Sequence, residues 1–445
     1  MPDYSNRKRY KKIGHNNRDN LTTPTEFFEY TSQVFNPRKA SSKPRPLEGI
    51  TVIDNTMVIF GAIGPMILST LGATVIKVEG PRGDYVWRRA IPFWTKHGLN
   101  VQYTYDNCNK YFISVDLHKP EGVDLFKKLV AKADILVENL TPENFDNWGV
   151  GYKDLIEVNP RLIYIWAGGW GRWGKYLGIP SYDALGQAMS GLSYASGFEG
   201  RPPMRATPWI GDYFGGVAIA AMALAGLFYR EKTGHGCYME IGHSANLTRY
   251  MDWIWPYVSM VGRNPPRMGN IDVQCGPSDV FRCKDGFVAI AAVLDKEWAG
   301  LCKAMGRPEL TSKYPDIASR LKKESLEKLV TTMGKWAKTK TTSELIELAE
   351  KYGFACDKVM SCKDLVESEH LRHRRQIQFV YDPLFKEEIC LPGIPVHLSE
   401  TPWNTKLAAR PPGFDNEYIL RNMLGLSEGE IEELKRKQVI VKEEG

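Results

Sequence analysis

The sequence lacks the features that would place the protein in a membrane or outside the cell. Its 445 residues contain no uninterrupted apolar run of the roughly 18 residues that cross a bilayer. The first residues, MPDYSNRKRYKK, lack the apolar stretch of a secretory signal. We therefore expect a cytoplasmic protein without a membrane partner. The apolar part of the GGVAIAAMALAGLFYREKTGHG run is likewise expected to be too short to span a bilayer.

Cysteine pairs and metal-ligand clusters are also missing. The eight cysteines form no C-x-x-C pair and no regular framework, which fits a reducing compartment. His370 and His373 lie three residues apart on an expected helix, but their setting, EHLRHRRQ, is cationic and offers no third ligand nearby. A solvated helix face explains these histidines, so no metal is expected.

The formal net charge of +6 is confined to one end of the chain. Residues 1–45 contain ten Lys or Arg and four Asp or Glu, so the remainder holds 48 residues of each sign. The excess belongs to a polar N-terminal extension and not to a basic face of the folded body. We expect no nucleic-acid partner.

Strands and helices alternate from residue 50 onward. A parallel sheet with helices on its faces is the arrangement this alternation predicts, and right-handed crossovers make it a Rossmann-like α/β fold. The expected strands are 50–55, 74–79, 112–116, 134–139 and 161–167, and the expected helices are 60–71, 120–131, 152–158 and a long one after Asp212.

The texture of the sequence changes after about residue 265. Two strands joined by a Lys-Asp-Gly turn are expected within 277–293, followed by helix-rich sequence from 296 to 351. We therefore predict a large domain at 46–265, an inserted smaller α+β domain at 266–384, and a return to the large domain at 385–445. Ser427 and Glu430 have capping-box spacing and start the last helix.

The first turn after a strand invites a dinucleotide interpretation. Gly61 and Gly64 form G-x-x-G, which does not match the G-x-G-x-x-G of a pyrophosphate-binding turn. Glu79 ends the second strand, where a ribose-binding acid would lie. One matching acid is weak support, so NAD is not expected.

The run IGDYFGG carries a more specific arrangement. Asp212 is expected directly before a helix whose first turn contains Gly215 and Gly216. An N-cap explains Asp212 without any chemistry. The same helix end would also keep the carboxylate ionised, and the glycines would leave room for a ligand to approach. An ionised carboxylate in a partly dry pocket can attack an acyl carbon. Asp183, in PSYDALGQAMSG, is a second cap-like carboxylate.

Motifs along residues 46–440 resemble those of the class III CoA-transferases, the family of formyl-CoA:oxalate and carnitine CoA-transferases. The matching runs are PLEGITVID, LGATVIKVEGPRGD, NCNKYFISVDLHKPEG, ADILVENLTPENFDNWGVGY, NPRLIY, SYDALGQAMSG, GDYFGG, YREKTGHG, CKDGFVAIA, MGRPEL and EIEELKRKQVI. The resemblance implies a large domain built from both ends of the chain, a small inserted domain and an interlaced dimer.

The resemblance also implies site residues. The family's catalytic aspartate corresponds to Asp212 and the acidic position of its preceding motif to Asp183, while backbone amides near Gly215 and Gly216 could steady an oxyanion. Departures from the formyl-CoA:oxalate pattern at Ile59, His118, Asn147 and Pro180 argue against oxalate. The candidate CoA contacts are Ile59, Phe60, Arg82, His118, Lys119, Asn139, Leu140 and Thr141, with Lys77 and Arg88 as further candidates for the phosphates.

The expected activity is CoA transfer from an acyl-CoA to a carboxylic acid through covalent intermediates on Asp212, without a metal or NAD. Aromatic residues near the two carboxylates admit a bulky or aromatic acid, or are core; they are Trp170, Trp173, Tyr194, Phe198, Trp209 and Tyr213.

Two other functions remain open. An α-methylacyl-CoA racemase would need a second acid-base group, but the family's histidine position reads Tyr182, whose phenol has a pKa of about 10. A non-catalytic scaffold subunit of a hetero-oligomer is the other alternative. A homodimer is expected, and a heterodimer with a paralogous subunit is an alternative.

Overall fold

The computed structural model describes residues 43–89, 100–393, 395–401 and 405–441. The described chain divides into two compact units, a smaller one from Ala195–Pro203 and Pro265–Ser368, and a larger one from the remaining described residues. The predicted N-terminal extension at 1–45 lies outside the described residues, except for 43–45.

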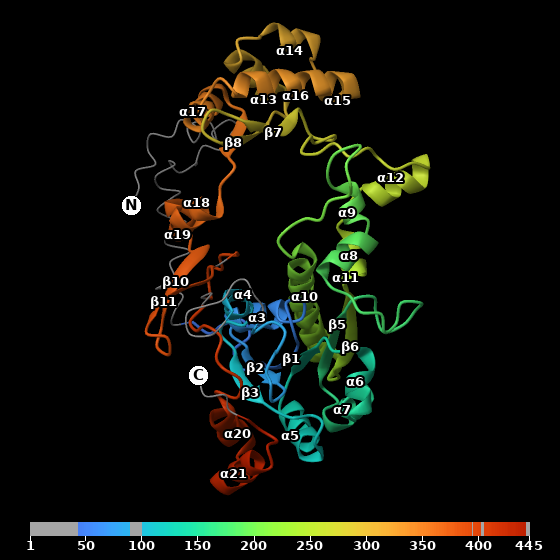
Figure 1. Ribbon diagram of the computed structural model, residues 1–445, viewed down its shortest axis with the longest axis vertical. Helices are drawn as coiled ribbons and strands as arrows, with labels where there is room; N and C mark the ends of the chain where they lie inside the picture. Colours follow the sequence, from blue (N-terminus) through green and yellow to red (C-terminus); the bar gives the residue numbers. More distant parts are fainter. Residues whose placement is uncertain (1–42, 90–99, 394, 402–404, 442–445) are drawn as a thin grey trace. The chain divides into compact units, whose positions relative to one another are not determined.

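A six-stranded parallel sheet forms the centre of the larger unit (Figure 1). Its strand order is β3-β2-β1-β4-β5-β6. The strands run parallel, but their order along the sheet reverses between β1 and β4, with β2 and β3 on one side and β4 to β6 on the other. The predicted Rossmann-like α/β class is thereby confirmed. The strands are β1 (Thr51–Asn55), β2 (Thr74–Glu79), β3 (Tyr111–Ser114), β4 (Ile135–Glu138), β5 (Ile163–Gly168) and β6 (Cys237–Gly242), of which β6 was not predicted.

Alternate side chains of each strand build two separate cores. Val52 and Val75 pack on one face with α3 and α10, whereas their neighbours Ile53 and Ile76 pack on the other face. Burial on both faces explains why apolar residues follow one another directly in these strands. The helices of this unit are α3 (Ile63–Thr70), α4 (Val101–Asp106), α5 (Pro120–Val130), α6 (Pro142–Asn147), α7 (Tyr152–Val158), α8 (Asp183–Met189), α10 (Ile210–Thr233), α11 (His243–Arg249), α12 (Ile254–Val261), α19 (Glu369–His373), α20 (Asn416–Leu424) and α21 (Glu428–Arg436), with α9 (Leu192–Ala195) at its boundary.

The C-terminal segment covers the edge strand β3. The backbone N–H of Phe112 donates to Asp415 Oδ2 at 2.8 Å, and the N–H of Ser114 donates to Asn416 Oδ1 at 2.9 Å. These two bonds occupy donors that an uncovered edge would expose. The following helix, α21, starts at the predicted Ser427–Glu430 capping box.

The smaller unit contains an antiparallel sheet with order β7-β8-β9. The predicted pair of strands is observed as β7 (Ser278–Arg282) and β8 (Phe287–Ala291), joined through the Lys-Asp-Gly turn. The remaining elements are β9 (Ala355–Lys358), α13 (Asp295–Ala304), α14 (Glu309–Lys313), α15 (Ile317–Leu321), α16 (Lys323–Ala337), α17 (Thr342–Tyr352) and α18 (Cys362–Glu367). The hairpin of β10 (Ile377–Asp382) and β11 (Glu387–Pro392) belongs to the larger unit. The smaller unit therefore ends at Ser368, before the predicted domain boundary at residue 384.

Helix α10 is longer than its apolar run indicated. Its 24 residues are long and apolar enough to cross a membrane by length and composition, which corrects the expectation that the segment is too short. A core helix meets the same criteria, and α10 packs against α3, β5 and β6 along a buried side formed by Gly216, Ile219 and Ala223. We interpret α10 as a core helix on this packing.

Candidate active site

The first turn of α10 carries Asp212, which is 5% exposed. The helix begins at Ile210, so Asp212 lies inside its first turn. The sequence had instead predicted that Asp212 directly precedes the helix. An acidic group in the first helical turn is favoured by the helix dipole. Burial raises the pKa of Asp212, and the adjacent carboxylate of Asp183 raises it further.

Asp183 anchors this helix start. Its Oδ1 accepts a hydrogen bond from the backbone N–H of Gly211 at 2.7 Å, and its Oδ2 accepts one from Gln187 Nε2 at 2.7 Å. Asp183 is 2% exposed. Oδ1 therefore links α8 to the start of α10, whereas Oδ2 bonds within α8. The side chain bonds to an amide of α10 and does not cap its own helix, as its sequence position had suggested.

A histidine that the sequence analysis did not single out lies against Asp212. His243 begins α11 directly after β6, and its Nε2 is 2.6 Å from Asp212 Oδ1. Its ring also lies 3.8 Å from the ring of Phe60. The hydrogen bond to His243 lowers the pKa of Asp212 and so opposes the effect of burial. A predicted β6 could have pointed to His243, because carboxyl ends of parallel strands meet at one edge of a sheet.

The two glycines of the motif make room for protein and not for a ligand. A Cβ on Gly215 would lie 1.8 Å from the Phe60 ring, and one on Gly216 would lie 2.3 Å from the Ile63 side chain. Their amides lie beyond the first four of the helix and so bond to carbonyls one turn earlier. The expected ligand space and oxyanion amides at Gly215 and Gly216 are therefore corrected.

Asn139 fastens the loop between β1 and α3, which carries Ile59 and Phe60. Its Oδ1 accepts from the backbone N–H of Met57 and its Nδ2 donates to Met57 O, both at 2.7 Å. Met57 and Asn139 follow β1 and β4, the two strands between which the strand order reverses, where ligands of such sheets bind. Ile59 is core-packed at 1% exposure, whereas Phe60 contacts His243.

A buried ionic cluster also holds this loop, through hydrogen bonds to its backbone carbonyls. Lys77 Nζ donates to Thr56 O at 2.6 Å, and Lys110 Nζ donates to Ala62 O at 2.9 Å. Both ammonium groups also bond to Asp54, and all three side chains are fully buried. The two lysines lower the pKa of Asp54 against the effect of burial, and burial lowers the pKa of Lys110 to about 8.

Two of the cations considered for CoA phosphates are thereby excluded. Lys77 belongs to this cluster, and Arg88 is 7% exposed and bonds through Nε and Nη2 to the carboxylate of Glu79. Glu79 also accepts from the hydroxyl of Tyr103 at 2.9 Å. Neither cation is free for a phosphate, and Glu79 is not a free ribose acceptor.

The other predicted CoA contacts lie on loops and helix starts. Arg82 and Thr141 are exposed, the latter at the start of α6. His118 is exposed and its ring nitrogen Nδ1 is 3.1 Å from Asp116. Lys119 donates to the carbonyls of Lys437 and Gln438 at 2.7 and 3.0 Å. The carbonyl of Leu140 accepts from Trp166 Nε1 at 3.2 Å.

The aromatic residues around the two carboxylates do not form one lining. Tyr213 donates its hydroxyl to Asp106 Oδ1 at 2.8 Å, and burial raises the pKa of Asp106 to about 7. Tyr182 is 62% exposed and Trp173 79% exposed. Within the described part of the chain, no group of three or more His, Cys, Asp or Glu could hold a metal ion.

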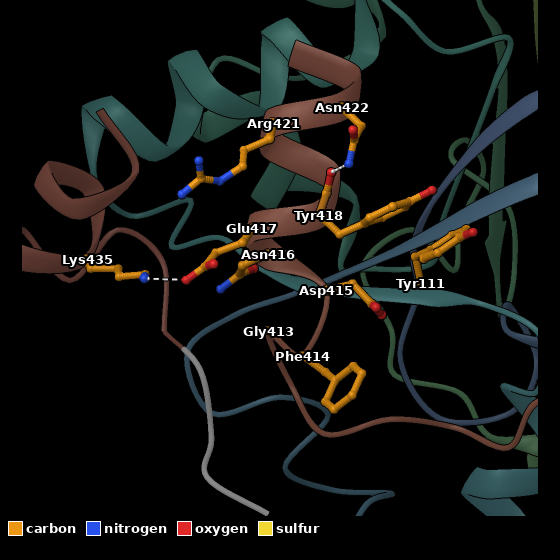
Figure 2. A pocket seen from close by; sticks show the side chains of 10 residues that line it. All are labelled: Tyr111, Gly413, Phe414, Asp415, Asn416, Glu417, Tyr418, Arg421, Asn422 and Lys435. Atoms are coloured by element: carbon orange, nitrogen blue, oxygen red, sulfur yellow. Dashed lines mark hydrogen bonds and ion pairs between the residues drawn. The ribbon is translucent and has the colours of Figure 1, made fainter. Parts of the chain in front are cut away.

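A separate hollow of about 730 Å³ lies beside the edge strand β3 and is lined by residues of β3, α20 and α21 and of the loop before α20 (Figure 2). Figure 2 shows Tyr111 of β3 beside Tyr418 of α20, with Glu417 joined to Lys435. The two tyrosine rings are stacked with centroids 5.4 Å apart. The hollow contains none of the predicted site residues, so the chemistry of Asp212 and not this cavity defines the candidate site.

Comparison with known proteins assigns the chain to a family. A sequence profile described as CoA-transferase family III matches residues 47–416. The chain belongs to this family. The predicted resemblance is confirmed, and the protein is a CoA-transferase, an enzyme whose substrates are CoA thioesters.

Two relatives and one solved structure illustrate the likeness of this CoA-transferase. It is 31% identical to succinyl-CoA–D-citramalate CoA-transferase of Chloroflexus aurantiacus over 89% of this chain and 98% of the relative. It is 33% identical to succinyl-CoA:mesaconate CoA-transferase of Haloarcula hispanica over 80% and 90% of the two chains. A CaiB/BaiF family crystal structure from Brucella suis superimposes with a TM-score of 0.75 at 25% identity, covering 84% and 98%.

The close approach of Phe60 to α10 predicts a strong effect of Gly215→Ala. The new Cβ would push the Phe60 ring from His243, which we expect to cost about 1–3 kcal/mol of stability and about 10²-fold in kcat through misplacement of the site. Urea unfolding and steady-state transfer assays measure both.

Gly429→Ala is the matched control, because nothing lies within 4 Å of an added Cβ at this helical glycine. We expect unchanged kcat and a gain in stability of roughly 0.5–1 kcal/mol. Wild-type stability and kcat in Gly215→Ala would contradict the packing argument.

Proposed function

We propose that this transferase moves CoA from an acyl-CoA to a carboxylic acid through covalent intermediates on Asp212. The supporting observation is a carboxylate at the start of α10 that keeps 7% of its side chain exposed and has one oxygen held by a neighbour. Such a group is poised by burial and needs no proton removed before it attacks, because it reacts as a carboxylate.

The proposed cycle conserves charge and protons. Asp212 attacks the thioester carbonyl carbon, the C–S bond breaks, and a mixed anhydride and CoA thiolate form. The thiolate then attacks Cγ of Asp212, the bond from Cγ to the bridging oxygen breaks, and the donor acid leaves as a carboxylate. The acceptor carboxylate repeats these steps in reverse from the aspartyl-CoA thioester. The bonds broken and formed are alike, so no external energy source is needed.

A short dicarboxylic acyl group is the substrate class that we propose. The two relatives transfer CoA between succinyl-CoA and D-citramalate or mesaconate, all of which carry a second carboxylate. Arg205 could bind such a carboxylate: its guanidinium carbon lies 5.1 Å from the ring centroid of Trp209, the residue before α10. It makes no ion pair with a carboxylate of the described residues. Arginine binds carboxylates with paired hydrogen bonds.

The racemase alternative is disfavoured by the geometry. A racemase needs two acid-base groups on opposite sides of the α-carbon, but Asp212 and His243 are in direct contact at 2.6 Å. No carbon fits between them.

Asp212→Asn tests the covalent mechanism. The amide is a poor nucleophile, so we expect transfer to fall by at least about 10⁴-fold, as on loss of other essential nucleophiles. Wild-type protein incubated with succinyl-CoA and then hydroxylamine should carry a hydroxamate at Asp212, detected by peptide mass spectrometry.

Glu231→Gln, an exposed acid on the same helix, is the control and should retain wild-type activity. Full activity in Asp212→Asn, or labelling of another residue, would refute the mechanism.

Arg205→Gln tests the dicarboxylic substrate. Loss of a charge-assisted contact worth roughly 1.5–3 kcal/mol should lower kcat/KM for succinate about 10- to 100-fold while leaving butyrate unaffected. The same panel should include aryl acids. Equal losses for succinate and butyrate would count against Arg205, and a clear preference for aryl acids would instead support the bulky-acid alternative.

We further propose a dimer of two copies of this chain, as the family resemblance implies. Val217, Leu224 and Phe228 leave an apolar face of α10 between 39% and 68% exposed, which a second copy would cover. Relatives with alpha and beta subunits make a heterodimer the alternative.

Light scattering of the purified chain should give twice the mass of the 50.4 kDa chain. Phe228→Glu should shift this dimer toward monomer, whereas Lys232→Glu at the exposed end of the helix should not. A wild-type monomer that is active alone would contradict the proposal, and an inactive monomer would favour the paralogous partner.

A further inference from the structure

His243 is fixed by three separate elements of the larger unit. Its Nε2 contacts Asp212 of α10, its ring lies on Phe60 of the loop after β1, and its Cβ occupies the space beside Gly186 of α8. A Cβ on Gly186 would come within 2.6 Å of His243 Cβ, so a larger residue at 186 would displace the imidazole. His243 is 4% exposed. These contacts hold the imidazole in place with Nε2 facing Asp212.

The surroundings of the ring determine which of its nitrogens donates to Asp212. Nδ1 is buried and has no hydrogen-bond partner among the described residues. An imidazolium would carry an unpaired N–H at this atom, and a buried unpaired donor costs about 1–3 kcal/mol. The neutral tautomer with its proton on Nε2 leaves no donor unpaired. His243 therefore donates Nε2–H to Asp212 Oδ1.

The bond to Oδ1 assigns different roles to the two oxygens of Asp212. Oδ1 is held by His243, so Oδ2 is the oxygen that attacks the acyl carbon and becomes the bridging oxygen of the anhydride. Oδ1 then becomes the carbonyl oxygen of the modified aspartate. When the CoA thiolate adds to Cγ, the negative charge develops on Oδ1, at the atom that faces the Nε2–H donor.

We propose that His243 is the oxyanion donor for the tetrahedral intermediates centred on Cγ of Asp212. This inference rests on the proposed aspartyl mechanism and adds a catalytic group to it. The donor lies at hydrogen-bond distance, 2.6 Å, from Oδ1, the atom on which the charge of the intermediate develops. It takes the role that the sequence had suggested for amides near Gly215 and Gly216, whose bonds lie inside the helix. The donor acts each time a thiolate or carboxylate enters or leaves Cγ.

His243→Leu and His243→Gln separate the donor from the packing. Each protein is mixed with succinyl-CoA without an acceptor acid, quenched with acid over time, and examined by intact-protein mass spectrometry for the CoA adduct. Loss of one oxyanion donor costs about 10²–10³-fold in rate, so His243→Leu should form the aspartyl-CoA adduct about 10²-fold more slowly. His243→Gln places an amide donor near the same point and should recover at least tenfold of this loss, while KM for succinyl-CoA stays within threefold.

Leu247→Ala is the matched control. Leu247 lies one turn later on α11 and its side chain packs at Gly211, 2.9 Å from where a Cβ on that residue would lie. This variant should unfold at a lower temperature but form the adduct within threefold of the wild-type rate.

The outcomes distinguish the two proposals. If wild-type protein forms no adduct at Asp212, the covalent mechanism itself fails. If wild-type protein forms the adduct and His243→Leu forms it equally fast, the mechanism stands and the role of His243 is wrong. A loss in Leu247→Ala equal to that in His243→Leu, or no recovery in His243→Gln, would assign the effect to packing and also overturn the proposal.

Discussion

The contact between Asp212 and His243 is the interaction on which the proposed active site depends. A carboxylate in a nearly dry setting loses its charge easily, because burial raises its pKa. The hydrogen bond from the imidazole opposes this effect and holds one of the two oxygens in place. The charge and the orientation of the Asp212 carboxylate therefore depend on the same hydrogen bond. The short distance requires the starts of α10 and α11 to be held close together, and the contacts of His243 with Phe60 and Gly186 do this.

The glycines of α10 contribute to the site by what they admit. Phe60 enters where a side chain on Gly215 would stand, and this brings its ring to 3.8 Å from His243. The loop that carries Phe60 is held by hydrogen bonds to Asn139 and to the two lysines bonded to Asp54. Some residues that the family resemblance assigns to CoA binding therefore also hold the loop after β1 in place. Asn139, for example, has both side-chain groups satisfied by Met57.

The position of the site follows from the topology of the sheet. Strand order reverses between β1 and β4, and Asn139 joins the loops that follow these two strands. Asp212 and His243 flank β6 in sequence, on helices α10 and α11. The parallel direction of the strands gathers loops from residues 55, 139 and 243 at one edge, although these residues are far apart in the chain. Short sequence motifs do not show that these loops lie close together in the fold.

Local patterns in the chain were sufficient for much of the fold and for the proposed nucleophile. Apolar runs of strand length, helix stops and the capping box at Ser427 are short-range signals, and each was observed close to its predicted position. Motif order identified the family, and IGDYFGG identified Asp212. The partner of Asp212 could not be found in this way, because a hydrogen bond between residues 31 positions apart leaves no periodicity. Burial likewise arises from long-range packing, which turned Lys77 and Arg88 from candidate phosphate ligands into internal ion-pair partners.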